Sequence, residues 1–598
     1  MREYAVPPNT QLGPTANLTE PVWRHERETP SAIAFQRFVD GKWLDLSAGE
    51  FAAHVRAVAK GLIAVGVQAG DRISIFADTR FDWTLADYAI MSAGAATVPI
   101  YPTSSAEQVE WILSDSGAVG VFCSGDDLVS TVDSVKPGLP DLANVWSFDG
   151  GAIESLIAAG KDIPDSAVEE RVATLTPDSL ATLIYTSGTT GRPKGCDLSH
   201  GNLLSECGSV LGAASDVFEP GNKTLLFLPL AHIFGKVIQC ACVQGSITIG
   251  HYSDVSKLVE IFPTFGPHFI LSVPRVFEKI YNGAKALAYQ SAVKKFFFDF
   301  AERTGIEYSQ AMETPAGPTK GLQRKHAIAD KLVFSKLRAG MGGEVKYAIS
   351  GGAPLGARLG HFFRGAGITI LEGYGLTETA AAATVNLPNK IKVGSVGPPV
   401  PGTTIKIADD GEVLIKGDIV FRGYWNNPDA TADAIESDGW FHSGDIGQLD
   451  ENGFLSITGR KKELLVTAAG KNVAPAVLED RINANPLISM SMVVGDGKPF
   501  IACLVTIDPE VFPKWKSDNG KPAGATVADL TDDYDLRKVV ESAVNEANKA
   551  VSRAESIRKF EILPEDFTEA GGEITPTLKL KRNVVMTKYA TEVEALYT

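Results

Sequence analysis

The sequence has few cysteines and no excess of positive charge. Only six of its 598 residues are cysteine, and only Cys240 and Cys242 stand close together. We therefore expect neither a disulfide framework nor a cysteine metal site, but buried small side chains. The 56 Lys and Arg stand against 72 Asp and Glu, a net charge of −16. This acidity argues against a general nucleic-acid-binding protein, because phosphate contacts require a basic surface.

Long hydrophobic runs are also missing. No uninterrupted apolar stretch reaches the length that spans a membrane. The N-terminus, MREYAVPPNT, has no basic stretch followed by an apolar core, so no secretory signal is expected. Hydrophobic residues make up 44% and charged residues 21%, which is ordinary for a globular protein. Because 598 residues are too many for one compact core, we expect a cytoplasmic enzyme of several cooperating domains.

Strand and helix patterns alternate through the first part of the chain. A capping box, Ser47-x-x-Glu50, precedes a helical pattern that continues to Leu62. Strands are predicted at 72–76, 96–100, 118–122, 180–184, 224–228 and 269–272, and helices at 85–93 and 106–113. This alternation predicts α/β layers with mostly parallel sheets. After about residue 400, short strands at 412–415 and 453–457 indicate a β-rich part.

The most distinctive segment is YTSGTTGRPKG, residues 185–195, which follows a predicted strand. Its small hydroxyl and glycine residues allow backbone N–H groups and hydroxyls to surround a phosphate, and Lys194 adds a positive charge. The segment is not a Walker A loop, because that pattern requires glycine where Pro193 stands. We therefore predict a phosphate-binding loop in preference to a polar hairpin turn.

This segment resembles the nucleotide-phosphate signature of the adenylate-forming enzymes, which include acyl-CoA synthetases, peptide-synthetase adenylation domains and luciferases. Further segments similar to the family follow in the family's order: PLAHIFG (229–235), SGGAPL (350–355), EGYGLTE (372–378), GWFHSGD (439–445), GRKKE (459–463) and GEITPTLKLKR (572–582). The resemblance covers nearly the whole chain. It implies a large N-terminal domain of layered α/β sheets with a short β-rich subdomain (1–460), and a small mobile α+β C-terminal domain (461–598).

The resemblance also implies a role for each segment. Tyr374 would stack on the adenine, and Asp445 would accept hydrogen bonds from the ribose hydroxyls, with Arg460 beside it. Glu378, a hard oxygen ligand, would bind Mg²⁺ together with Thr186. The nucleotide-binding residues implied in this way are Thr186, Ser187, Gly188, Thr189, Thr190, Lys194, Gly351, Gly352, Glu372, Gly373, Tyr374, Thr377, Asp445 and Arg460.

The implied catalytic residues are Lys579, Glu378 and His232. A lysine on a long stem can bring a point charge to the carboxylate and the α-phosphate together, and Lys581 is the alternative lysine for this role. Lys462 matches the hinge position of the family, and Gly470 and Lys471 would line the approach of the CoA thiol. His232 would lie near the acyl carboxylate.

The implied reaction has two halves. A carboxylate attacks the α-phosphorus of ATP to give an acyl-adenylate, and the thiol of CoA then expels AMP. Phrases such as VPIYPT (98–103), SVPRVFEK (272–279) and KLVFSKLR (331–338) resemble the bacterial long-chain fatty-acid–CoA ligases. This implies a long-chain fatty acid as substrate, ATP and CoA as co-substrates and Mg²⁺ as cofactor. Some bacterial relatives have a tryptophan gate four residues after the histidine, where this chain has Lys236.

Other readings of the same resemblance stay open. One is a fatty acyl-AMP ligase that delivers its adenylate to a carrier protein. Another is a non-catalytic lipid- or nucleotide-binding relative, and a third is a luciferase-like oxygenase. The long-chain-ligase phrases argue against the first. The presence of Lys194, Glu378, Asp445, Arg460 and Lys579 argues against the second.

The region 275–338 has an unusual charge. It contains twelve Lys or Arg and six Asp or Glu, a local balance of +6 in a chain of −16. KKFFF, residues 294–298, places three aromatic residues beside two cations. One interpretation is a helix with a buried Phe face and a solvated basic face. The other hypothesis is a peripheral contact with an anionic membrane, at the inner membrane face.

Overall fold

A computed structural model describes residues 1–186, 192–468, 471–575 and 579–598. The chain forms two compact units. The first contains 1–406, 414–443 and 449–455, and the second contains 407–413, 444–448 and 456–598. The mixed α/β architecture agrees with the fold class that the sequence predicts. The six cysteines are all buried and free, as expected.

A mostly parallel sheet of seven strands organises one half of the first unit. In order across the sheet, the strands are β18 (Gly423–Tyr424), β9 (Lys194–Ser199), β8 (Leu180–Thr186), β5 (Ala96–Ile100), β4 (Arg72–Phe76), β6 (Ala118–Cys123) and β7 (Asn144–Ser147). Only β8–β9 and β9–β18 pair antiparallel. The predicted strands and helices of this region are confirmed, including the capping box between Ser47 and Glu50 that begins α2 (Ala48–Ala64).

A second sheet of eight strands completes the framework of this unit. Its order is β15 (Thr384–Val385), β14 (Thr369–Tyr374), β13 (Tyr347–Ser350), β12 (Phe269–Ser272), β10 (Lys223–Leu226), β11 (Thr248–His251), β2 (Ile33–Val39) and β3 (Lys42–Ser47). The pairs from β14 to β2 are parallel. Strand β10 ends two residues earlier than predicted, because the chain turns there into the loop that leads to His232.

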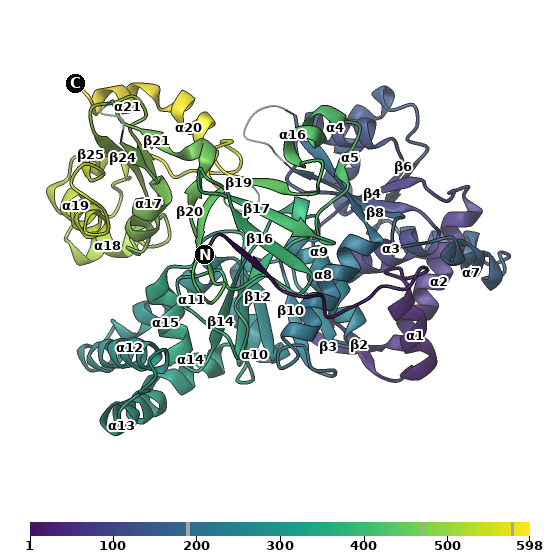
Figure 1. Cartoon of the computed structure of the whole chain (residues 1–598), viewed down its shortest axis with the longest axis horizontal. Helices are drawn as coiled ribbons and strands as arrows, with labels where there is room; N and C mark the ends of the chain where they lie inside the picture. Colours follow the sequence, from purple (N-terminus) through teal and green to yellow (C-terminus); the bar gives the residue numbers. More distant parts are fainter. Residues whose placement is uncertain (187–191, 469–470, 576–578) are drawn as a thin grey trace. The chain divides into compact units, whose positions relative to one another are not determined.

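Helices cover both sheets. Those between the strands of the first sheet are α3 (Phe81–Ser92), α4 (Ala106–Ser116), α5 (Gly125–Val135), α6 (Ala152–Ala159) and α7 (Asp165–Ala173). The others in this unit are α1 (Glu20–Glu28), α8 (His200–Ala213), α9 (Ile233–Gln244), α10 (Leu258–Phe265), α11 (Pro274–Ala288), α12 (Ala292–Met312), α13 (Lys320–Ala329), α14 (Ser335–Gly340), α15 (Ala357–Gly365) and α16 (Pro428–Ala434). Figure 1 shows α12, α13 and α15 side by side, at the lower left. Among the described residues, no helix is both long and apolar enough to cross a membrane.

A third sheet contains the short strands expected after residue 400. Its order is β1 (Glu3–Ala5), β16 (Thr403–Ile407), β17 (Glu412–Gly417), β19 (Phe441–Leu449) and β20 (Leu455–Arg460). The strand predicted at 453–457 therefore begins two residues later and continues to Arg460. A turn precedes the strand, because the carboxylate of Asp450 accepts the N–H groups of Asn452 and Phe454.

The second unit has its own hydrophobic core. Its main sheet has the order β23 (Ile488–Val494), β24 (Ile501–Ile507) and β25 (Ile557–Ile562), beside a pair of short strands, β21 (Leu465–Val466) and β22 (Asn472–Val473). The helices are α17 (Pro475–Asn483), α18 (Phe512–Asp518), α19 (Tyr534–Asn548), α20 (Arg582–Lys588) and α21 (Ala590–Ala595). Residues of α17, β24 and α19 such as Leu478, Val505 and Leu536 are fully buried together, which makes this unit an α+β domain.

An ion pair inside the second unit fixes the start of α20. Arg582 binds the carboxylate of Glu479 on α17, and its second nitrogen donates to the carbonyl of Val493 at 3.2 Å. The other oxygen of Glu479 accepts the N–H of Val493 at 2.6 Å. Both side chains are largely buried, at 18% and 11% exposed. The pair therefore ties α17, β23 and the beginning of α20 together.

We expect Glu479→Ala to destabilise the second unit strongly, because the buried guanidinium of Arg582 loses its nearest carboxylate and keeps only Glu463, at 3.5 Å. Removing one partner of such a pair costs about 3–5 kcal/mol. Amide hydrogen exchange in β23 and β24 should accelerate by about 100-fold or more in the full-length protein. The matched control is Glu546→Ala, which removes an exposed pair with Lys549 and should cost less than about 1 kcal/mol. Equal exchange in the two variants would contradict this account.

Candidate functional site

The hairpin of β8 and β9 presents the predicted phosphate-binding segment. Strand β8 is buried up to Tyr185, and its last residue, Thr186, pairs with Lys194, the first residue of β9. The loop therefore leaves and re-enters the sheet at two predicted site residues that face each other across the hairpin. The predicted residues Ser187, Gly188, Thr189 and Thr190 lie outside the described residues.

Glu378 and Lys194 lie on either side of one tyrosine. Tyr424 on β18 donates its hydroxyl to Oε1 of Glu378 at 2.8 Å. Nζ of Lys194 lies 4.9 Å from the centre of the Tyr424 ring. Burial, with the nearby Glu378 carboxylate, raises the pKa of Tyr424, so the phenol stays a hydrogen-bond donor. The structure thus brings a cation and a carboxylate together at the edge of the seven-stranded sheet. Tyr424 is a residue that the sequence analysis missed.

A second group of predicted residues lies at the ends of β13 and β14. The two strands are parallel, with Ser350 opposite Glu372, so Gly351 and Gly352 leave the sheet beside Gly373 and Tyr374. The carboxyl ends of parallel strands are the usual place for a ligand in such sheets. Oε1 of Glu372 accepts the N–H of Leu355 at 2.8 Å, which folds the loop 351–355 back over β14.

The start of α9 borders this second group. His232 is the N-cap residue of α9, and its Nδ1 accepts the N–H of Phe234 at 3.2 Å. A Cβ atom added at Gly351 would lie 3.6 Å from the ring of Phe234, so the glycine loop packs next to the first turn of this helix. The structure therefore brings His232 close to the predicted adenine-binding loop.

A buried carboxyl group supports the segment that carries Thr377 and Glu378. These two residues lie in a 3₁₀ turn, after which Ala380 and Ala381 take φ angles of 51° and 109°, a region that L-residues other than glycine seldom adopt. Oε1 of Glu206 on α8 accepts the N–H of Ala382 at 3.0 Å. Burial raises the pKa of Glu206 well above its usual value and so favours its neutral form. No local pattern in the sequence predicts this contact.

In the second unit, Asp445 and Arg460 form an ion pair. Nε of Arg460 lies 3.3 Å from Oδ1 of Asp445, and Asp445 is buried while Arg460 is about half exposed. Glu412 accepts the N–H of Gly444 at 3.0 Å, next to Asp445. These are the two residues expected at the ribose, and the structure brings them together.

The predicted hinge residue is preceded by a charged contact. Nζ of Lys461 donates to Asp410 at 2.6 Å and to Glu412 at 2.9 Å, and these two bonds, the one to Asp410 first, raise the pKa of Lys461 to about 12. Lys462, the predicted hinge, is exposed. The acidic residues therefore engage Lys461, next to the predicted hinge.

The two candidate lysines near the C-terminus differ in their surroundings. Lys579 is exposed, and its N–H donates to Oγ1 of Thr575 at 3.0 Å. Lys581 is half-buried at the start of α20, where its N–H donates to the carbonyl of Glu573 at 2.7 Å. The greater exposure of Lys579 favours it for contact with a ligand.

The two residues predicted on the CoA side lie in a different segment of the second unit. Nζ of Lys471 lies 3.3 Å from Oε1 of Glu555, so Glu555 orients this cation. The predicted Gly470 lies outside the described residues. In the parts of the chain that the structure describes, no cluster of three His, Cys, Asp or Glu residues could hold a metal ion.

The sequence matches two family models. Residues 22–425 match the AMP-binding enzyme family, and 462–598 match the AMP-binding enzyme C-terminal domain. The long-chain-fatty-acid–CoA ligases FadD15 of Mycobacterium bovis and Mycobacterium tuberculosis are each 50% identical over 600 residues, with 100% of both chains covered. The long-chain-fatty-acid–CoA ligase ACSBG2 of Xenopus laevis is 32% identical over 93% of this chain and 80% of its own.

Solved structures show the same fold. The adenylation domain of a carboxylate reductase from Mycobacterium chelonae matches 98% of this chain and 92% of its own with a TM-score of 0.73 and 22% identity. The fatty acyl CoA synthetase of Mycobacterium tuberculosis matches 96% of this chain and 99% of its own with a TM-score of 0.63 and 22% identity. Together with the family models and the full-length relatives, these matches show that the chain belongs to the family of AMP-binding enzymes.

Proposed function

We propose that this protein is a long-chain fatty-acid–CoA ligase that forms AMP. A carboxylate oxygen of the fatty acid bonds to the α-phosphorus of ATP, the bond to the bridging oxygen breaks, and pyrophosphate leaves. The sulfur of CoA then bonds to the acyl carbon, AMP leaves with the bonding electrons, and the thiol proton passes to solvent. One observation carries the proposal: Lys194, at the start of β9, lies beside Tyr424 and Glu378.

The nucleotide is assigned to the predicted residues. In our proposal, the loop after Thr186 and the ammonium of Lys194 bind the phosphates, helped by the hydroxyl of Thr377. Tyr374 lies against the adenine, and Asp445 accepts hydrogen bonds from the ribose with Arg460 beside it. The same set includes Ser187, Gly188, Thr189, Thr190, Gly351, Gly352, Glu372 and Gly373. ATP carries about four negative charges, so cations are needed before a second anion can approach it.

We assign Mg²⁺ to Glu378 and Thr186. Mg²⁺ in nucleotide sites is usually bound by one or two protein oxygens together with substrate phosphates. One carboxylate oxygen of Glu378 is used by Tyr424, which fixes the orientation of the group. A bound Mg²⁺ would supply positive charge at the phosphates. Tyr424 would keep the Glu378 carboxylate turned toward the same side as Lys194.

The acyl group and the second half-reaction are assigned to other segments. We propose that His232 orients the acyl carboxylate and that Lys579 stabilises the charge that builds up at the α-phosphorus. In this proposal, residues 1–460 bind the nucleotide and the acyl group, and residues 461–598 rotate about Lys462 between the half-reactions. Gly470 and Lys471 would then line the approach of CoA.

A membrane contact would explain the unusual surface of the α11–α12 hairpin. Because ATP and CoA are supplied in the cytoplasm, we place the protein there, at the inner membrane face. Four apolar residues around the turn between the helices are exposed: Leu287 by 64%, Val293 by 65%, Phe296 by 69% and Phe297 by 36%. The next residue of the aromatic run, Phe298, is buried. The buried Phe298 agrees with a helix that has a buried Phe face, and the exposed Phe296 and Phe297 are what supports the proposed membrane contact.

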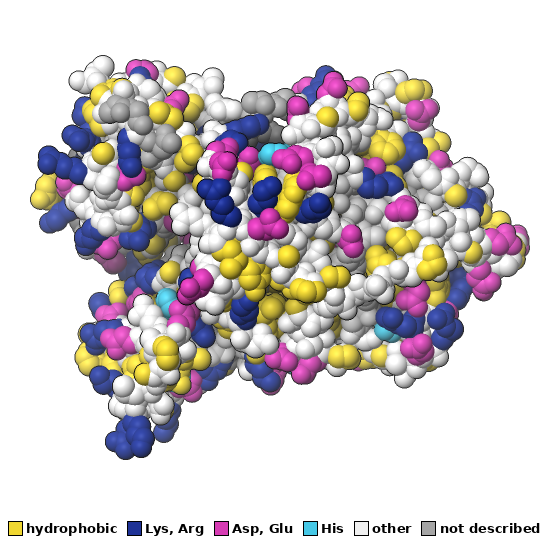
Figure 2. All heavy atoms as spheres, viewed as in Figure 1, with side chains coloured by type: hydrophobic (Ala, Val, Ile, Leu, Met, Phe, Trp, Pro, Cys, Tyr) yellow, Lys and Arg dark blue, Asp and Glu magenta, His cyan; other side chains and the backbone are white. Residues whose placement is uncertain are grey.

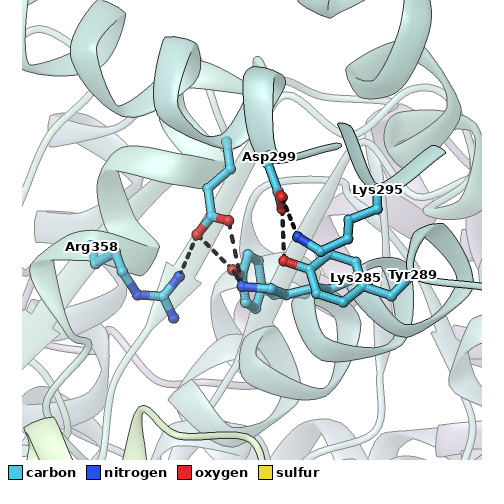
Figure 3. A network of polar contacts seen from close by, with 7 residues as sticks. Lys285, Tyr289, Lys295, Asp299 and Arg358 are labelled. Atoms are coloured by element: carbon cyan, nitrogen blue, oxygen red, sulfur yellow. Dashed lines mark hydrogen bonds and ion pairs between the residues drawn. The ribbon is translucent and has the colours of Figure 1, made fainter. Parts of the chain in front are cut away.

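Two acidic residues of the hairpin, Asp299 and Glu302, are occupied by internal contacts. Asp299 accepts bonds from Tyr289 at 2.6 Å and Lys295 at 2.5 Å, as Figure 3 shows. Glu302 binds Tyr281 at 2.6 Å, with Lys285 and Arg358 around it. Lys294, in contrast, is exposed and has no ion pair within the described residues. The hairpin thus combines exposed aromatic groups with an unpaired cation.

A neighbouring helix adds positive charge to this part of the first unit. Figure 2 shows Lys and Arg side chains gathered over α13, where Lys320, Arg324 and Lys325 are exposed. Aromatic side chains beside Lys and Arg are the features by which peripheral segments bind anionic lipid. We propose that this surface takes up fatty acid at the membrane.

The assay that tests the ligase follows pyrophosphate, AMP and acyl-CoA in the presence of ATP, Mg²⁺ and palmitate. With CoA, we expect all three products in equal amounts. Without CoA, we expect pyrophosphate and a bound adenylate only. No acyl-CoA, with transfer of the acyl group to a carrier-protein thiol, would establish the fatty acyl-AMP ligase in its place. No pyrophosphate under any condition would establish the non-catalytic relative.

Lys579→Ala should abolish the first half-reaction and spare the second. Charge accumulates at phosphorus only during adenylation, so we expect a fall of about 100-fold or more in pyrophosphate release with palmitate. Formation of palmitoyl-CoA from preformed palmitoyl-adenylate should stay within about threefold of the wild type, because that step builds no charge at phosphorus. The control is Lys581→Ala, which should retain adenylation. Equal loss of both half-reactions in Lys579→Ala would exclude the assigned role.

The membrane contact predicts binding to vesicles that contain anionic lipid. Phe296→Ser and Lys294→Glu should each weaken binding in flotation assays by about fivefold or more, since a cation near the surface contributes about 1 kcal/mol, and raised salt should weaken it further. Lys161→Glu makes the same charge change at an exposed lysine outside the hairpin and should leave binding unchanged. If vesicle binding is unchanged by raised salt and by both hairpin variants, the membrane contact is excluded, whatever the ligase assay shows.

A further inference from the structure

One ion pair of the first unit is completely buried. Lys236, in the first turn of α9, binds Asp87 on α3, and both side chains are 0% exposed. The carboxylate of Asp87 has further partners: Oδ1 accepts the hydroxyl of Thr97 at 2.7 Å, and Oδ2 accepts the amide of Gln239 at 2.8 Å. The pair therefore joins α3, β5 and α9 through one carboxylate.

Neutral groups extend the network to β11. The hydroxyl of Thr84 donates to Oε1 of Gln239 at 2.6 Å and contacts Nε2 of His251 at 2.8 Å. Burial lowers the pKa of His251 to about 3, so the imidazole is neutral. Because the hydroxyl proton goes to Gln239, Nε2 of His251 is the donor in the second contact. Lys236 and Asp87 are thus the charged pair at the centre of this network.

Stability alone is a poor explanation for such a pair. Two charges lose their hydration on burial, and apolar residues of similar volume are often equally or more stabilising. Buried ionic groups are better known for fixing one arrangement of the elements that they join. We therefore consider which arrangement of α3, β5 and α9 this pair fixes.

The pair lies one helical turn from His232. The backbone N–H of Lys236 donates to the carbonyl of His232 at 3.1 Å. At the other end of the same segment, the hydroxyl of Thr79, just before α3, donates to the carbonyl of Leu228 at 2.7 Å. Between these two contacts the chain turns tightly, since a Cβ atom at Gly235 would lie 2.6 Å from the carbonyl oxygen of Pro229. The segment 228–236 is therefore attached to the α3 region at both ends.

We propose that the Lys236–Asp87 pair is a positioning device for His232: it fixes the first turn of α9 so that the imidazole meets the acyl carboxylate in one orientation. The inference rests on the role proposed for His232. Neither charged group touches the substrate in this account. A displacement of the imidazole of about 1 Å is enough to slow a reaction by about 100-fold, so a rigid attachment has a large effect on rate.

The experiment removes the two charges together. Lys236→Met combined with Asp87→Leu leaves no unpaired buried charge, but the Thr97 hydroxyl and the Gln239 amide lose an acceptor, so the double variant should stay folded with a moderately lowered unfolding temperature. We expect kcat/KM for palmitate in pyrophosphate release to fall by about 10- to 100-fold. The KM for ATP should stay within about twofold. A purely structural pair would be replaced without loss, so a stable double variant with wild-type kcat/KM would overturn the proposal.

A cycle with His232→Ala shows whether the pair acts through the imidazole. Residues that act as a unit are not additive. The triple variant should therefore be no more than about threefold slower than His232→Ala alone. If the losses in kcat/KM of the double variant and of His232→Ala multiply in the triple variant, the pair does not act through His232, and the proposal is overturned.

A second variant keeps the proposal testable if the double variant does not fold. Thr79→Val removes only the contact at Leu228, and we expect it to lower kcat/KM for palmitate and to be non-additive with His232→Ala in the same way. Additive behaviour of Thr79→Val would count against the proposal. Failure of the ligase function itself would be distinguishable, because the wild type would then release no pyrophosphate with palmitate.

Discussion

A buried carboxylate that accepts a backbone N–H is the interaction on which the candidate site depends. It occurs at four places, two of them loops and two of them strands, and each acceptor is a buried glutamate. The four pairs are Glu206 with Ala382, Glu372 with Leu355, Glu412 with Gly444 and Glu479 with Val493. A loop has few side-chain contacts of its own. A hydrogen bond from its backbone N–H to a buried carboxyl group, charged or neutral, can therefore fix its conformation.

The partners of these four groups differ. Glu412 and Glu479 also face a cation, Lys461 and Arg582 respectively. Glu206 has no cation among its described contacts, and its second oxygen has no partner there, so its burial favours the neutral acid. A neutral acid can hold the strained turn after Glu378 without adding a negative charge near the assigned phosphate-binding residues. This matters for a site that must receive ATP.

Local patterns in the sequence are enough to predict most of the elements, since they depend on neighbouring residues. The capping box of α2 and the alternation of strands and helices are of this kind. The motif segments also point to the right elements, because Thr186 and Lys194 must face each other once β8 and β9 form a hairpin. None of these patterns requires knowledge of distant contacts.

The supporting contacts, in contrast, leave no local signal. Glu206 and Ala382 are 176 residues apart, and Asp87 and Lys236 are 149 apart. Glu206 stands in a helix whose sequence gives no reason to expect a neutral buried acid. Lys236 is a lysine, and lysines are almost never fully buried unless paired. Its burial follows only from the packing of α9 on α3, which a single sequence does not reveal.

The charge of the whole chain also says little about any one surface. The net charge of −16 excludes broad attraction to polyanions, but ion pairs redistribute it locally. In the α11–α12 hairpin, Asp299 and Glu302 are turned toward Tyr289, Tyr281 and the paired cations, while Lys294 remains exposed. Screening limits the reach of surface charges to about 8–10 Å. What an approaching membrane or nucleotide meets is therefore set by the side chains within that distance, and both candidate surfaces present unpaired or weakly paired cations there.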